Sequence, residues 1–118
     1  MEPKDIKNIY LIAICGTGMA GLAGLLKGSG YYVSGSDTNI YPPMSTLLEN
    51  AGIPVLSGYR KENITDDIDL VIIGNAVSKS NEEVQAVAMS TRNIHSRVIS
   101  NANAIKTVLL AQTEAHLN

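Results

Sequence analysis

A glycine-rich loop at residues 15–21, Cys-Gly-Thr-Gly-Met-Ala-Gly, follows an apolar run at residues 9–14 and opens a stretch of small residues. Gly16, Gly18 and Gly21 stand in the G-x-G-x-x-G spacing that is typical of a strand-turn-helix unit around a phosphate. In that spacing, Gly16 makes the tight turn, Gly18 lets the backbone approach a ligand, and Gly21 lets the helix pack closely on the strand. The loop therefore predicts a helix whose first N–H groups point at a bound phosphate.

The lack of basic side chains near this loop limits the groups with which it could bind an anion. No Lys or Arg lies between Ile9 and Leu26, so backbone amides and the helix dipole would supply most of the attraction. Asp37 follows downstream, at the position where such units place a carboxylate for ribose hydroxyls. Two alternatives stay open: the glycines can serve packing alone, and Asp37 can be a solvated turn residue.

Strand-like and helix-like segments alternate along the chain. Apolar runs predict strands over residues 9–14, 31–35, 53–56, 69–73 and 95–99. Helices are expected over residues 19–27, 44–51, 82–89 and 102–112, and residues 58–67 should form a loop with at most one helical turn. This alternation predicts an α/β fold, a Rossmann-like three-layer domain with a five-stranded parallel sheet in the order 3-2-1-4-5.

Two local signals should fix helix ends. Gly52 follows the second predicted helix and is expected at the C′ position, where a left-handed backbone is common. Ser80 and Glu83 have the spacing of a capping box and should begin the third helix.

The predicted strand order places a candidate binding crevice between the first and fourth strands. Ligands of open parallel sheets bind at the carboxyl ends of strands beside the point where the order reverses. The Gly16 loop and residues 74–78 should therefore flank one crevice, with residues 35–37 as a side wall. Asn75 can present its amide to a ligand or cap its own loop, and Tyr41 can stack on a planar group or cover the loop.

Composition limits the other possibilities. The 118 residues are expected to form one domain, and the net charge of −2 with no basic stripe argues against nucleic acid as a partner. The apolar runs are shorter than a membrane span, so no membrane association is expected. A single cysteine, Cys15, cannot form an internal disulfide, which favours a cytoplasmic location. Cys15 is expected to be a packing residue, because no base lies near it in sequence.

A catalytic centre within this chain is not expected. The sequence contains no G-x-x-x-x-G-K-[ST] motif for ATP, no metal-ligand cluster and no nucleophile-base pair. No catalytic residue and no metal site are therefore assigned, and no cofactor is expected to bind to this stretch of chain.

The chain resembles the N-terminal domain of the Mur ligases, which build or recycle the peptide of peptidoglycan. Residues 41–49 most resemble the family branch that attaches a tripeptide to UDP-N-acetylmuramate, whereas the residues from 100 onward depart from that branch. A second branch, which attaches L-alanine, shares the glycine loop, so the amine substrate stays open. The matches lie at residues 14–19, 33–37, 52–53, 58–59 and 69–76 and at Asn81.

The resemblance implies a role in substrate binding. In this family the first domain binds the UDP part of UDP-N-acetylmuramate, the second binds ATP and magnesium, and the third brings the amine. The present chain would then be an N-terminal fragment that is not catalytic alone, with ATP, Mg²⁺ and the ATP-binding and C-terminal domains belonging to the full-length ligase. By motif, the diphosphate would contact Gly16, Thr17, Gly18 and Met19, the ribose or uracil would contact Ser36, Asp37 and Asn39, and Gly74, Asn75 and Ala76 would close the other side.

Two other functions fit the glycine spacing. One is an NAD-binding Rossmann domain of a dehydrogenase or a redox-sensing regulator, although such a domain does not require the segment at residues 41–49. The other is a structural α/β domain without a ligand, in which the glycines serve packing.

Overall fold

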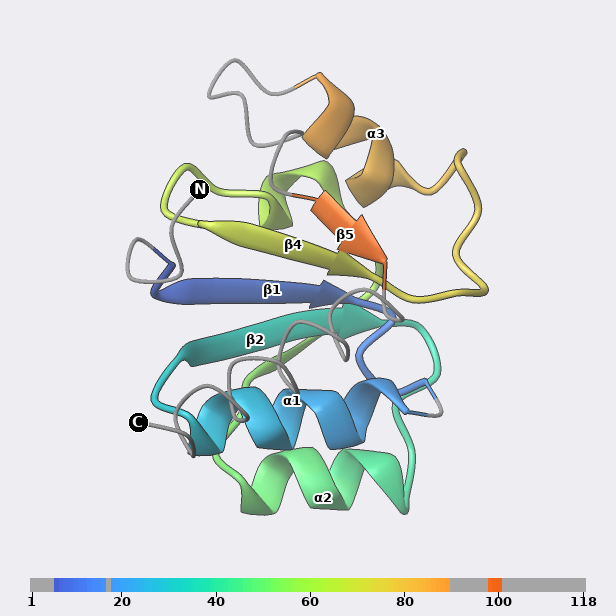
Figure 1. The fold of residues 1–118 in the computed structure, drawn as a ribbon. Helices are drawn as coiled ribbons and strands as arrows, with labels where there is room; N and C mark the ends of the chain where they lie inside the picture. The colour runs from blue at the N-terminus through green and yellow to red at the C-terminus, as the bar shows by residue number, and fades with distance from the viewer. Residues whose placement is uncertain (1–5, 17, 90–97, 101–118) are drawn as a thin grey trace.

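The computed structural model describes residues 6–16, 18–89 and the backbone of the strand at residues 98–100. Its strands all pair in parallel, in the order β3-β2-β1-β4-β5, which confirms the predicted α/β fold and strand order (Figure 1). The strands are β1 (Asn8–Ile12), β2 (Tyr32–Asp37), β3 (Val55–Ser57), β4 (Leu70–Ile73) and β5 (Val98–Ser100). The helices are α1 (Met19–Gly28), α2 (Met44–Asn50), α3 (Glu82–Ala88) and the 3-10 helix η2 (Lys61–Asn63).

The sheet is the middle of three layers. Along β1, Ile9 and Leu11 join the core under α1 and α2, whereas Tyr10 and Ile12 join the core with Val87 of α3. This period-two alternation buries both faces of the strand, as its continuous apolar sequence predicts. Figure 1 shows α1 and α2 together on one side of the sheet and α3 on the other.

β1 ends two residues earlier than the apolar run predicts. Ala13 takes a left-handed backbone with φ of 70°, which breaks the extended conformation. The amides of Ala13 and Ile14 then both donate to the Ser36 carbonyl oxygen, at 2.9 and 3.0 Å. Ile14 nevertheless stays buried, so its apolar side chain serves the core from the loop.

Close packing of a neighbouring element against a glycine is predicted at Gly21, but the structure shows it at Gly35. Gly21 is exposed on α1, and a Cβ built there meets no atom within 4 Å, so the predicted packing role of Gly21 is wrong. A Cβ on Gly35 would lie 2.4 Å from the Leu11 carbonyl oxygen and 2.8 Å from Ile14 Cβ. The glycine that packing requires is therefore in the middle of β2.

The helix ends follow one of the two predicted signals. Gly52 has φ of 73° and follows the Ala51 cap of α2, which confirms its expected C′ role. The capping box from Ser80 is wrong, because Asn81 caps α3 and accepts from the amides of Glu83 and Val84 at 2.8 and 3.2 Å. Glu83 does not complete such a box, since its carboxylate turns inward to other partners.

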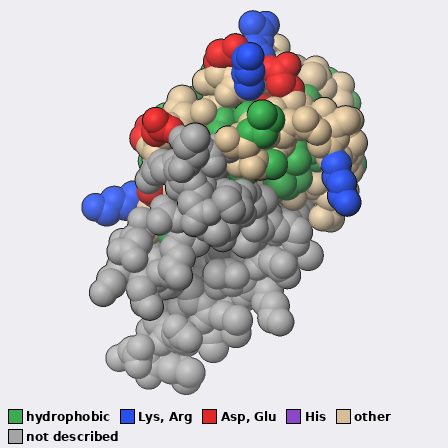
Figure 2. Space-filling view, turned by 90° about the horizontal axis from the view of Figure 1, so that it is seen from above, with side chains coloured by type: hydrophobic (Ala, Val, Ile, Leu, Met, Phe, Trp, Pro, Cys, Tyr) green, Lys and Arg blue, Asp and Glu red, His purple; other side chains and the backbone are tan. Residues whose placement is uncertain are grey.

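The remaining boundaries shift slightly. The fifth strand is described at Val98–Ser100, within and just beyond the predicted residues 95–99, whereas residues 95–97 and the predicted helix at 102–112 lie outside the described residues. Within the described ranges, no helix has the length and apolar character that crossing a bilayer requires. Figure 2 shows hydrophobic side chains near the middle of the face seen from above, with Lys, Arg, Asp and Glu spread around its margin.

Candidate functional site

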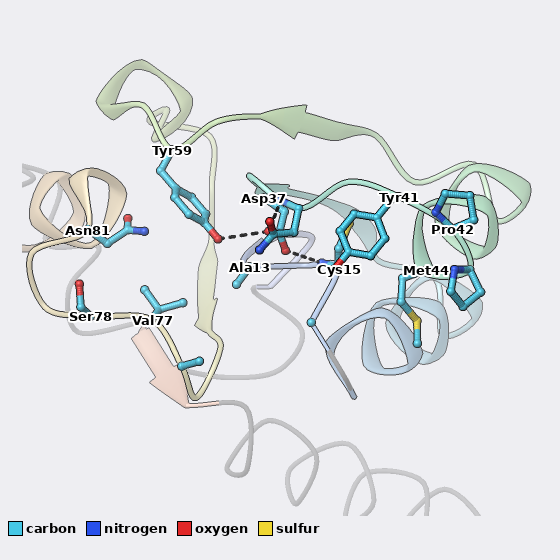
Figure 3. Close-up of a pocket in the computed structure, with 14 residues that line it drawn as sticks. Ala13, Cys15, Asp37, Tyr41, Pro42, Met44, Tyr59, Val77, Ser78 and Asn81 are labelled. Carbon is cyan, nitrogen blue, oxygen red and sulfur yellow. Dashed lines mark hydrogen bonds between the residues drawn. The ribbon is translucent and has the colours of Figure 1, made fainter.

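A cavity of about 680 Å³ opens at the carboxyl ends of β1, β2 and β4, where the strand order predicts a crevice. Figure 3 shows Ala13, Cys15 and Asp37 in its middle, between two walls from distant parts of the chain. One wall combines the loop after β4 with Tyr59, and the other is the segment that leads into α2. The lining residues are Ala13, Cys15, Gly16, Asp37, Asn39, Tyr41, Pro42, Pro43, Met44, Tyr59, Ala76, Val77, Ser78 and Asn81.

Four of the predicted site residues line this cavity, and they lie at the carboxyl ends of three strands or in the loops that follow them. Gly16 follows β1, Asp37 is the last residue of β2 and Asn39 follows it, and Ala76 follows β4. The fold thus brings together three segments that are far apart in the sequence, as the predicted strand order implies.

Other predicted residues lie behind the lining. Ser36 is fully buried and donates its hydroxyl hydrogen to Glu83, so its side chain faces the core and is not available at the cavity. Met19 is also a core residue, at 2% exposure, which excludes its side chain from the lining. Gly18 caps α1 with φ of 84° but is not a lining residue. Thr17 lies outside the described residues.

Behind the other wall, Gly74 and Asn75 do not line the cavity either. A Cβ on Gly74 would lie 3.3 Å from both Ala13 Cβ and the Ile12 carbonyl oxygen, so the absence of a side chain lets β4 lie close to β1. Asn75 is exposed, and its neighbour Ala76 is the residue of this turn that lines the cavity.

Asp37 joins the glycine loop to β2. Its Oδ2 accepts from the Cys15 amide at 2.9 Å, and its Oδ1 accepts from the Asn39 amide at 2.9 Å. The residue is only 4% exposed, so these charge-assisted bonds replace most of its hydration. The carboxylate therefore shapes the site, whether or not it also touches a ligand.

Tyr59 faces Asp37 across the cavity (Figure 3). Its hydroxyl donates to Asp37 Oδ1 at 3.5 Å. Burial, followed by the negative charge of Asp37, raises the pKa of Tyr59 to about 12. The hydroxyl therefore stays a neutral donor throughout the physiological range. Sequence analysis gave Tyr59 no role, because it lies in a polar stretch after β3 that carries no periodic signal.

The raised pKa of Tyr59 predicts a loss of stability in alkali. An unfolded tyrosine ionises near pH 10, so the fold holds its full contribution below that pH and loses it as pH rises through about 12. In a phenolate absorbance titration, Tyr59→Phe should remove one of the late-ionising tyrosines and make unfolding less pH-dependent in that window. Tyr41→Phe is the control, because Tyr41 is 64% exposed. A late phase that survives unchanged in Tyr59→Phe would contradict the assignment.

Cys15 behaves as a packing residue. It is half-buried against the core, and burial, followed by the charge of Asp37, raises the pKa of its thiol. A raised pKa keeps the thiol protonated and unreactive near neutral pH.

The electrostatics of the lining do not favour a metal or a side-chain cation clamp. Asp37 is the single charged residue among the described lining residues. No set of three or more His, Cys, Asp or Glu suited to a metal occurs among the residues that the structure describes. A bound anion would thus depend on backbone amides, hydroxyls and side-chain amides.

Comparisons with known proteins find similar sequences in one enzyme family. The family model described as "Mur ligase family, catalytic domain" matches residues 8–106. The chain is 52% identical over 80 residues to the UDP-N-acetylmuramate–L-alanyl-gamma-D-glutamyl-meso-2,6-diaminoheptandioate ligase of Escherichia coli K12, covering 68% of this chain and 18% of that protein. It is 39% identical over 85 residues to the UDP-N-acetylmuramate–L-alanine ligase of a Psychrobacter species, covering 72% of this chain and 17% of that protein.

A solved structure shares the fold. The murein peptide ligase of Psychrobacter arcticus 273-4 superposes with a TM-score of 0.76 at 36% identity, covering 86% of this chain and 20% of the other. The chain thus spans about a fifth of the length of the proteins that it matches.

Proposed function

We propose, for a chain that belongs to the Mur ligase family, that this domain binds the UDP part of UDP-N-acetylmuramate. The observation that carries the proposal is the convergence of Gly16, Asp37, Asn39 and Ala76 on one cavity at the switch point of the sheet. The printed names of the relatives add chemical support, since both matched ligases are UDP-N-acetylmuramate ligases. The domain would be the first of three in a cytoplasmic ligase.

The cavity offers separate surfaces for the parts of this ligand. The glycine loop would hold the diphosphate through backbone amides at the start of α1, whereas the Gly16 amide itself closes the turn by donating to the Ala13 carbonyl oxygen at 3.1 Å. Asp37 and Asn39 would face the ribose or uracil, because each Asp37 oxygen keeps acceptor capacity beyond its amide bond. Ala76 would close the opposite side. Ser36, Met19, Gly74 and Asn75 would support these surfaces from behind.

ATP and Mg²⁺, which the whole ligase would use, do not fit the described residues. The lining offers one carboxylate and no Lys or Arg, and the sequence contains no ATP loop of the G-x-x-x-x-G-K-[ST] type. We therefore assign those groups, and the amide-forming step, to other domains of the ligase. The amine substrate, L-alanine or a tripeptide, belongs with those domains too.

The NAD-binding alternative is not supported. The family match and the relatives described above are ligases that act on a UDP-sugar, by their printed names.

Calorimetry of the purified chain with four ligands tests the proposal. UDP-N-acetylmuramate and UDP should bind, whereas NAD and ATP should bind at least about tenfold more weakly, a difference of about 1.4 kcal/mol. Binding of NAD without binding of the uridine ligands would overturn the proposal. Failure of all four would favour a structural domain in which the glycines serve packing.

A pair of bulky substitutions sharpens the same test. Ala76→Trp should fill the cavity and abolish UDP binding with little change in stability, because Ala76 is exposed at the lining. Leu25→Trp is the matched control, since Leu25 is 51% exposed on α1 and does not line the cavity.

A further inference from the structure

A buried carboxylate on α3, Glu83, has no part in the proposed ligand contacts. It is 0% exposed, and sequence analysis assigned it only to a helix cap. The Tyr10 hydroxyl lies 3.0 Å from both of its oxygens, and the Ser36 hydroxyl lies 2.5 Å from Oε1. The Arg60 amide and Asn63 Nδ2 lie 3.1 and 2.7 Å from Oε2.

Each of these four partners acts as a donor, and none of the donor groups carries a charge. Glu83 therefore acts as an acceptor on every side, which suits a carboxylate and satisfies a polar group that would otherwise be costly to bury. The donors come from β1, β2, η2 and the loop between β3 and η2. A single side chain thus joins five separate segments, its own helix included.

Three of these segments continue directly into the cavity lining. Ser36 precedes Asp37, Arg60 follows Tyr59, and Glu83 lies two residues after Asn81. Asp37, Tyr59 and Asn81 line the cavity, and Tyr59 reaches Asp37 across it. The buried carboxylate therefore lies directly behind three parts of the wall.

We propose that Glu83 is a positioning residue for the nucleotide cavity. Its carboxylate fixes the loop after β3 and the start of α3 against β2, which holds the Tyr59 hydroxyl on Asp37. The expected loss of UDP affinity rests on the proposed function, whereas the expected loosening of the cavity wall beside Arg60 does not.

Glu83→Gln tests this role with little change in shape. The glutamine amide replaces one acceptor oxygen with a donor, so no orientation can accept from all four partners. The loop at Arg60 should then loosen, and the Kd for UDP should rise about tenfold or more. Tyr10→Phe is the matched control: it removes one donor to the same carboxylate, but Tyr10 lies within β1 and its nearest lining neighbour, Ala13, is in the following loop.

Two measurements on the 118-residue chain separate the outcomes. Amide hydrogen exchange at Arg60, whose amide donates to Glu83, is followed by NMR in the free protein. The Kd for UDP is measured below the unfolding temperature of each variant. Glu83→Gln should speed exchange and weaken UDP binding, whereas Tyr10→Phe should lower the melting temperature and leave both readouts at wild-type values. Wild-type exchange and wild-type affinity in Glu83→Gln would overturn the proposal.

The remaining outcomes are also decisive. If wild-type protein does not bind UDP, the proposed function fails, and the exchange rates alone then decide the role of Glu83. If Glu83→Gln does not fold, Asn63→Ala replaces it, because Asn63 donates to Glu83 and to the Gly58 carbonyl oxygen. Unchanged exchange at Arg60 in Asn63→Ala would then overturn the proposal.

Discussion

Gly35→Ala is expected to lower the free energy of unfolding by about 3–5 kcal/mol, which is a large part of the total stability of a domain of this size. The added methyl group would lie 2.4 Å from the Leu11 carbonyl oxygen and 2.8 Å from both Ile14 Cβ and Ile14 Cδ1. Leu11 is in the central strand and Ile14 is fully buried, so neither can move without disturbing the sheet or the core. This is overpacking against the backbone, for which no rotamer change compensates.

Urea unfolding followed by circular dichroism would measure this loss. The matched control is Gly21→Ala, the same change within α1, where a Cβ meets open space. That variant should gain about 0.5–1 kcal/mol, because alanine favours a helix interior over glycine. Wild-type stability of Gly35→Ala would show that β1 and β2 lie farther apart than described.

Asp37→Ala is expected to lower stability by about 2–4 kcal/mol, because it leaves the amides of Cys15 and Asn39 without their acceptor. The variant also loses the carboxylate that Tyr59 faces, so UDP affinity should fall at least about tenfold. Urea unfolding and calorimetry with UDP measure the two effects separately.

Two isosteric variants control for shape and charge. Asp37→Asn keeps one acceptor oxygen and should fall between wild type and Asp37→Ala. Asp66→Asn makes the same change of charge at an exposed position and should stay within about 0.5 kcal/mol of wild type. If Asp37→Ala matched Asp66→Asn in both measurements, Asp37 would be a solvated turn residue.

The parts of the fold that the sequence predicts are those with local causes. Continuous apolar runs and Gly or Pro between them identify β1, β4 and α2, and the alternation of elements predicts the strand order. The predictions are wrong where the role of a residue depends on contacts with residues that are distant in sequence. Gly35 is required by Leu11 and Ile14, and Glu83 leaves the helix cap because Tyr10 and Ser36 bind it.

The site shows the same division. Topology predicts which strand ends meet, so the position of the cavity follows from sequence, and Gly16, Asp37 and Ala76 are placed there correctly. The face of the sheet toward which a strand side chain points is harder to predict from sequence. Ser36 lies one residue before Asp37, yet its side chain is buried on the side of α3, where it donates to Glu83. Tyr59 lies in a polar stretch with no periodicity, which gives no warning that it reaches Asp37.

The parallel pairing of β1 also sets an order of assembly. Ile9 pairs with Val33 on one side and with Leu70 on the other. Closing the shorter chain segment costs less entropy, so the β1-α1-β2 unit should form before β4 docks. Since the cavity needs the loop after β4, it is completed late in folding. A ligand that binds only the finished cavity would then slow the first opening step of unfolding, the departure of β4, more than the later ones.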